Sequence, residues 1–221
     1  MALNIIQYIY FLILFACVLY SNSLFFFKRN KNDLLFIYLT IIFVIDFTVL
    51  LFFKIKEKNL SWLYNISDVI TVLFLSYYIK KQFKNKLKLL VPTGIFLSLL
   101  ILYISLGKSG YMLENGIITG LYVIGVSIMF FYFLIKVKTL EEIKIIEIPA
   151  FWFIISFLLS SVFFIFRLIP RFYFQNLNAN FMESIRIFFL IINIVMYLLI
   201  MVALTKYSKN KAQKTNEDVA Q

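Results

Sequence analysis

Long apolar runs separated by short charged segments dominate the chain, and this pattern predicts its architecture. The runs fall near residues 4–27, 34–53, 62–79, 89–106, 116–135, 149–169 and 182–205. A bilayer core about 30 Å thick needs about 20 apolar residues per helical crossing. The runs lack the alternation of a barrel strand, so helices are the structure that satisfies their backbone in lipid. The pattern predicts an all-α integral membrane protein, with a seven-transmembrane-helix bundle over residues 1–205.

Composition supports a membrane protein and removes several kinds of chemistry. Of the 221 residues, 62% are hydrophobic and 15% are charged, whereas soluble domains are about 45–50% apolar. Histidine is absent and Cys17 is the single cysteine, so we expect no intrachain disulfide, no metal site and no cofactor. The net charge of +11 lies in short clusters between apolar runs, which argues for membrane orientation and against a nucleic-acid partner.

The positions of lysine and arginine predict the direction of the crossings. With the amino terminus outside, 15 of the 22 basic residues fall in the cytoplasmic segments and seven on the other side. We therefore predict a multi-pass protein of the bacterial inner (cytoplasmic) membrane, with the amino terminus outside and the carboxyl terminus in the cytoplasm. Residues 206–221 are basic and polar, which is typical of a disordered cytoplasmic tail.

Two aspartates inside the apolar runs are the most informative polar residues. An ionisable group near the bilayer centre costs about 2.5–3.5 kcal/mol on insertion scales, so it needs a partner, water or a function. Asp46 and Asp68 are equally distant in sequence from Glu57, so an antiparallel hairpin would place them at similar depth. Asn65 and Thr71 recur at intervals of three with Asp68 and predict one polar stripe.

The last two runs offer further polar groups on the same predicted side of the membrane. These candidates are Arg167, Glu183, Arg186, Asn193 and Tyr197. One hypothesis is that ion pairs between aspartates and arginines lock the helices together. A second is that the same residues line a wet pocket for a small polar or amphipathic ligand from the outer side, and a third is a proton or ion path.

Three short motifs carry a resemblance to a known class of proteins. They are Trp62-x-x-Asn65, Pro149-Ala150-Phe151-Trp152 and Asn193-x-x-x-Tyr197. In layout and in these motifs the chain resembles small seven-helix membrane proteins of Bacteroidetes-type bacteria, which are similar to the sensor-like membrane modules associated with histidine kinases. This resemblance implies a receptor-like module that signals to a separate cytoplasmic or membrane protein partner.

The sequence thus favours a non-enzymatic, receptor-like signalling module embedded in the lipid bilayer. An alternative is a membrane-embedded, lipid-modifying hydrolase that uses Asp46 and Asp68 as acid and base; the chain is similar to lysoplasmalogenase-like membrane hydrolases in its size and its intramembrane aspartates. An accessory subunit or a small-molecule transporter of the inner membrane are further alternatives. A transporter needs a polar path across the whole bilayer, whereas the strong polar groups here cluster in the outer half.

Overall fold

The apolar runs form helices because a helix satisfies every backbone N–H and C=O group within itself, which lipid cannot do. The computed structural model describes residues 2–27, 34–56, 60–83, 87–108, 110–138, 144–173 and 179–219. These residues form α1 (Ala2–Phe27), α2 (Leu34–Lys56), α3 (Leu63–Gln82), α4 (Leu90–Ser105), α5 (Leu113–Lys138), the short 3₁₀ helix η1 (Ile145–Glu147), α6 (Pro149–Tyr173) and α7 (Ala179–Val219). The all-helical fold class is confirmed for the described part of the chain.

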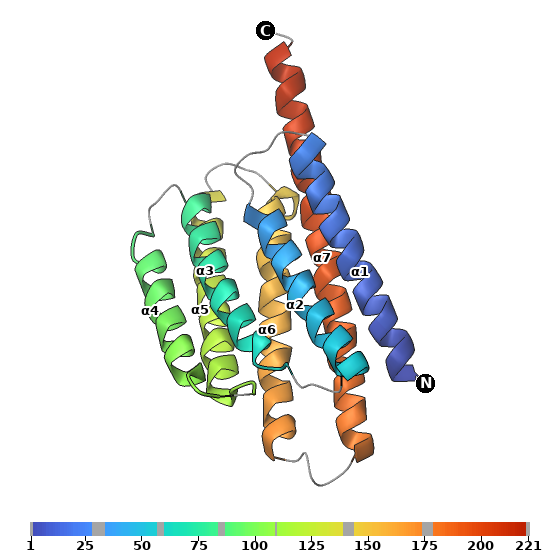
Figure 1. Ribbon diagram of the computed structural model, residues 1–221. Helices are drawn as coiled ribbons and strands as arrows, with labels where there is room; N and C mark the ends of the chain where they lie inside the picture. The colour runs from blue at the N-terminus through green and yellow to red at the C-terminus, as the bar shows by residue number, and fades with distance from the viewer. Residues whose placement is uncertain are drawn as a thin grey trace.

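The helices run up and down in one bundle, with the two chain ends at opposite ends of it (Figure 1). Helix α1 packs against α2 and α7, so that the first and last helices lie side by side. Helix α3 packs against α2, α4 and α5, and α6 packs against α5 and α7. We call the end with residue 2 the amino-terminal end of the bundle; helices α2, α4 and α6 also end there.

Five of the described helices are long and apolar enough to cross a membrane, which indicates a multi-pass membrane protein. The candidate spans are Leu3–Phe25, Leu35–Phe52, Leu113–Lys136, Pro149–Leu168 and Phe181–Ser208. The other two predicted crossings form α3 and α4, which are not among these candidate spans. Helix α4 has only 16 residues, and α3 includes the polar residues Asn65, Asp68 and Thr71.

Helix α7 is longer than the predicted seventh crossing. It has 41 residues and runs to Val219, so it continues through the segment that the sequence predicts as a polar tail. At about 1.5 Å per residue, its length is roughly 60 Å, twice the bilayer core of about 30 Å. Figure 1 shows its last turns extending beyond the rest of the bundle.

Aromatic rings fill the centre of the bundle where α2, α3 and α6 meet. The Tyr38 ring stacks on Phe74 with centroids 4.3 Å apart and lies 5.7 Å from Phe157. Phe153 is 1% exposed and packs edge-on against Phe74 at 5.7 Å. Such ring pairs add about 0.5–1.5 kcal/mol to the burial of their area, so this cluster holds the three helices together.

Helix α5 approaches α6 closely at two glycines. A Cβ atom added at Gly116 would lie 2.9 Å from Cδ1 of Leu168, and one added at Gly120 would lie 2.8 Å from Cγ1 of Ile165. Both neighbours belong to α6. The pair is therefore a small-xxx-small contact between helices, as its spacing suggests.

Candidate functional site

Asp46 takes part in a contact that joins α1, α2 and α7. The Tyr10 hydroxyl on α1 donates a hydrogen bond to Oδ2 of Asp46 on α2. The Tyr10 ring also packs against the ring of Tyr197 on α7, with centroids 5.8 Å apart. The Cys17 thiol donates to the backbone oxygen of Tyr197 at 3.3 Å. Tyr197, a candidate from the sequence, therefore lies beside the Asp46–Tyr10 pair.

Asp68 has a similar partner from a different part of the fold. Tyr111, in the connection between α4 and α5, donates its hydroxyl to Oδ2 of Asp68 at 2.9 Å. The Tyr111 ring meets Phe164 of α6 edge-on, with centroids 6.3 Å apart. The Asp68–Tyr111 pair thus links α3, the α4–α5 connection and α6 at the amino-terminal end of the bundle.

Asn65 holds the α4–α5 connection against α3. Its Nδ2 donates to the Gly110 carbonyl oxygen at 2.9 Å, and its Oδ1 accepts from the Met112 backbone N–H at 3.2 Å. Oδ1 also accepts from Nδ2 of Asn115 at 3.0 Å, and the same Nδ2 reaches Oγ of Ser105 at 2.7 Å. Both amide groups of this pair are buried, so the network has a structural role.

Thr71 completes the polar stripe that the sequence predicted on α3. Its hydroxyl lies 3.2 Å from the Tyr38 hydroxyl of α2 and donates to the Ser67 carbonyl oxygen at 2.8 Å. The stripe therefore contacts two neighbouring parts of the fold. Asn65 and Asp68 contact the α4–α5 connection, and Thr71 contacts α2.

The remaining candidates lie apart from the two aspartates. The Arg167 guanidinium lies over the Phe189 ring at 4.2 Å, a cation–π contact between α6 and α7. Glu183 and Arg186 are exposed near the start of α7, and Asn193 is half-buried one turn before Tyr197. In the described part of the chain, Asp46 and Asp68 are paired with tyrosines rather than with Arg167 or Arg186.

Tyr10 and Tyr111 were not among the candidate residues from the sequence. Tyr10 lies inside the first apolar run. A phenol at that depth needs a hydrogen-bond partner, and this was the available signal. Tyr111 gave no such signal because it precedes its apolar run.

The two pairs have the same chemical groups. Each offers a carboxyl group and a neutral hydroxyl donor. Among the described residues no group of three or more Asp, Glu, Cys or His side chains is placed to hold a metal ion. In each pair the tyrosine hydroxyl donates to the aspartate carboxyl group.

Comparison with protein-family models, curated proteins and solved structures gives no match to this chain. In its described residues the chain is an all-helical protein with seven α-helices and five candidate membrane spans.

Proposed function

We propose that this chain is a receptor-like signalling protein of the bacterial inner membrane, which crosses the bilayer seven times with its amino terminus outside. In this proposal a small polar or amphipathic ligand enters from the amino-terminal end of the bundle. It competes for the interior hydrogen bonds, and α7 carries the resulting change to a partner protein on the cytoplasmic side.

The observation that carries the proposal is the contact of the Asp46–Tyr10 pair with α7. A ligand that donates to Asp46 would release the Tyr10 hydroxyl, and the Tyr10 ring packs on Tyr197. Tyr197 lies in a helix that continues without interruption to Val219. A ligand shifts such an equilibrium only through its differential affinity for the two arrangements, and exchange of this hydrogen bond supplies that difference.

The hydrolase alternative is less well supported by the geometry. An acid and base pair must reach the same substrate atoms. Asp46 is bonded to a tyrosine of α1, whereas Asp68 is bonded to a tyrosine of the α4–α5 connection. The two carboxyl groups thus belong to separate contacts.

Two matched tyrosine variants test the coupling to α7. Spin labels at Thr205→Cys on α7 and Ile146→Cys in η1, both exposed positions, would report the distance between them; Cys17 is buried and can be retained. We expect Tyr10→Phe to shift or broaden this distance distribution and Tyr111→Phe to leave it unchanged, although each removes one hydroxyl bonded to an aspartate. Equal behaviour of the two variants would contradict the proposal.

A second measurement separates signalling from turnover. The double variant Asp46→Asn, Asp68→Asn should assemble as the wild type does, and neither protein should hydrolyse phospholipids or lysolipids in reconstituted vesicles. If the wild type hydrolyses a lipid and the assembled double variant does not, the signalling proposal fails and the hydrolase hypothesis replaces it.

A further inference from the structure

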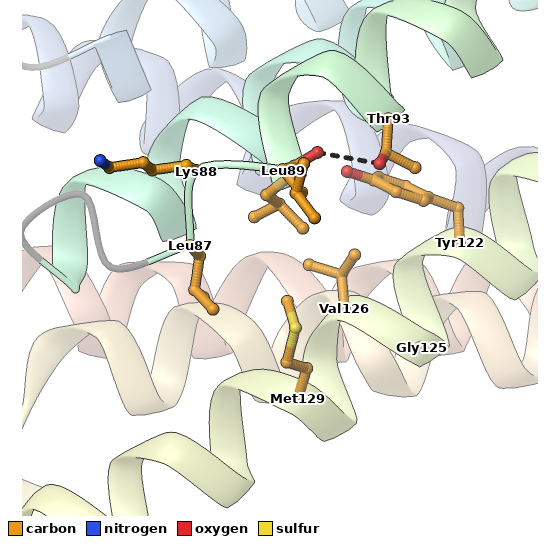
Figure 2. A pocket seen from close by; sticks show the side chains of 9 residues that line it. Leu87, Lys88, Leu89, Thr93, Tyr122, Gly125, Val126 and Met129 are labelled. Carbon is orange, nitrogen blue, oxygen red and sulfur yellow. Dashed lines mark hydrogen bonds between the residues drawn. The ribbon is translucent and has the colours of Figure 1, made fainter.

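A groove opens at the corner where α3 leads into α4, far from the two aspartate pairs. Its volume is about 420 Å³. Figure 2 shows its lining side chains converging from α5, the start of α4 and the α3–α4 connection. The lining residues are Leu87, Lys88, Leu89, Leu90, Thr93, Tyr122, Gly125, Val126 and Met129.

The groove exists because α4 is too short to cover α5. At the amino-terminal end of the bundle the two helices are aligned by the hydrogen bond between Asn115 and Ser105. From there α4 has 16 residues and α5 has 26, which correspond to about 24 Å and about 39 Å at 1.5 Å per residue. The first residue of α4 therefore lies about 15 Å short of the carboxyl-terminal end of α5. Val126 and Met129 of α5 line the space beside the first turn of α4.

The polar atoms within the groove already have partners. The Tyr122 hydroxyl is hydrogen-bonded to Oγ of Ser76. The Thr93 hydroxyl donates to the Leu89 carbonyl oxygen at 2.8 Å, the dashed line in Figure 2. An apolar occupant leaves both bonds intact, whereas a polar occupant would have to compete with them. The interior of the groove thus suits a hydrocarbon chain.

The surroundings of the groove are strongly basic. No aspartate or glutamate occurs between Val69 and Leu113, and five lysines fall between positions 80 and 88. Lys80 and Lys81 occupy the last turn of α3, and Lys84 and Lys86 lie outside the described residues. Figure 2 shows Lys88 extending away from the apolar side chains, which places its ammonium group at the edge of the groove. A basic rim beside an apolar groove complements an anionic headgroup with an attached acyl chain.

We infer that this groove binds an anionic phospholipid from the leaflet in which these lysines lie. The acyl chain lies along Val126 and Met129, and the phosphate lies at the rim, beside Lys88. The proposal concerns a lipid site beside the first turn of α4 and the middle of α5. It is independent of the proposed ligand response at Asp46.

Native mass spectrometry of the full chain can test this inference. The protein would be released from micelles that contain equal amounts of phosphatidylglycerol and phosphatidylcholine with identical acyl chains, and the retained lipids would be counted. Lys88→Gln removes the charge at the rim, and Lys108→Gln, at an exposed position beyond the other end of α4, is its control. Gly125→Phe fills the groove, because a Cβ there meets no heavy atom within 4 Å. Ile128→Phe, at a position of α5 that is 60% exposed, is its control.

We expect Lys88→Gln to weaken phosphatidylglycerol retention about fivefold, the factor that corresponds to about 1 kcal/mol per surface lysine, with no change for phosphatidylcholine. Gly125→Phe should reduce retention of both lipids, and the two controls should behave as the wild type. The inference is overturned if Lys88→Gln matches Lys108→Gln, or if Gly125→Phe leaves retention unchanged. It is also overturned if Gly125→Phe converts a dimer to a monomer, because a second copy would then occupy the groove. Met129→Trp provides a second filling variant if Gly125→Phe does not fold.

Discussion

Each of the two aspartates inside this bundle is held by one tyrosine hydroxyl. A phenol donates a hydrogen bond without adding a second charge, so neither pair places an arginine deep in the apolar interior. Arg167 instead covers the Phe189 ring, and Arg186 is exposed near the start of α7. Cationic side chains near helix ends can reach the interface in this way. Both carboxyl groups are therefore bonded to neutral phenols, whereas the Arg167 guanidinium covers an aromatic ring.

Asn65 is the residue whose replacement should affect stability most directly. Its side chain makes three hydrogen bonds to the α4–α5 connection and to α5. Interhelical hydrogen bonds in membrane proteins average about 0.6 kcal/mol each, so Asn65→Leu should lower the free energy of unfolding by about 2 kcal/mol. Unfolding in mixed micelles would measure this. Asn4→Leu, at an exposed position of α1, is the control, and an equal loss in both variants would contradict the structural role of Asn65.

The sequence predicted the polar stripe on α3 but not the partners of its members. Asn65, Asp68 and Thr71 are spaced three residues apart, and this spacing can be read from a short segment of the sequence. Their partners cannot be found in this way, because Tyr111 lies 43 residues from Asp68 and Asn115 lies 50 residues from Asn65. The aspartate–arginine hypothesis matched opposite charges, whereas the fold satisfies these carboxyl groups with neutral donors from other helices.

Helix α5 approaches α6 closely at Gly116. Gly116 faces α6, and a Cβ there would also lie 2.5 Å from the Tyr111 hydroxyl oxygen, which is bonded to Asp68. One glycine thus serves both the packing of α5 on α6 and the position of Tyr111. The four-residue spacing of Gly116 and Gly120 is typical of close helix packing, but it does not indicate which helix provides the contact.

Replacement of two glycines of α5 by alanine should have opposite effects. Gly116→Ala overpacks the contact with Leu168 and Phe164 and should destabilise the bundle by about 1–3 kcal/mol. Gly125→Ala meets open space and should be neutral or stabilising by up to about 1 kcal/mol, because alanine favours a helix more than glycine does. Thermal unfolding of both variants in detergent would measure the difference. A tolerated Gly116→Ala would show that α5 and α6 can separate without loss of stability.

The whole molecule is a bundle closed by its first and last helices. Helix α1 packs against α7. The first and last helices start and finish at opposite ends of the bundle (Figure 1), as an odd number of antiparallel helices requires. The apolar pattern predicted the seven α-helices of the described residues, since long apolar helices are specified by local hydrophobicity. The apolar pattern could not predict the neighbours of each helix, because tertiary packing determines them. Helix α4, for example, packs mainly against α3 and α5.

Reporter fusions test the proposed direction of the whole bundle. Green fluorescent protein joined after Gln221 should fluoresce in bacterial cells, because it folds in the cytoplasm. Alkaline phosphatase joined after Lys108, in the α4–α5 connection, should be active, because that connection is proposed to lie outside. Activity of the phosphatase at Lys144 but not at Lys108 would reverse the orientation, and activity at both positions would contradict a single topology.

The hydrogen bonds of the two aspartates also differ in the order in which the ribosome synthesises the donor and the acceptor residue. Tyr10 is synthesised 36 residues before Asp46, so the donor is already in the membrane when that carboxyl group arrives. Tyr111 is synthesised 43 residues after Asp68, so α3 enters with its carboxyl group unbonded to that tyrosine. At about 5–20 residues per second the wait lasts a few seconds. Helix α3 therefore needs water, the translocon or a lipid headgroup to solvate Asp68 until α4 and the following connection have emerged.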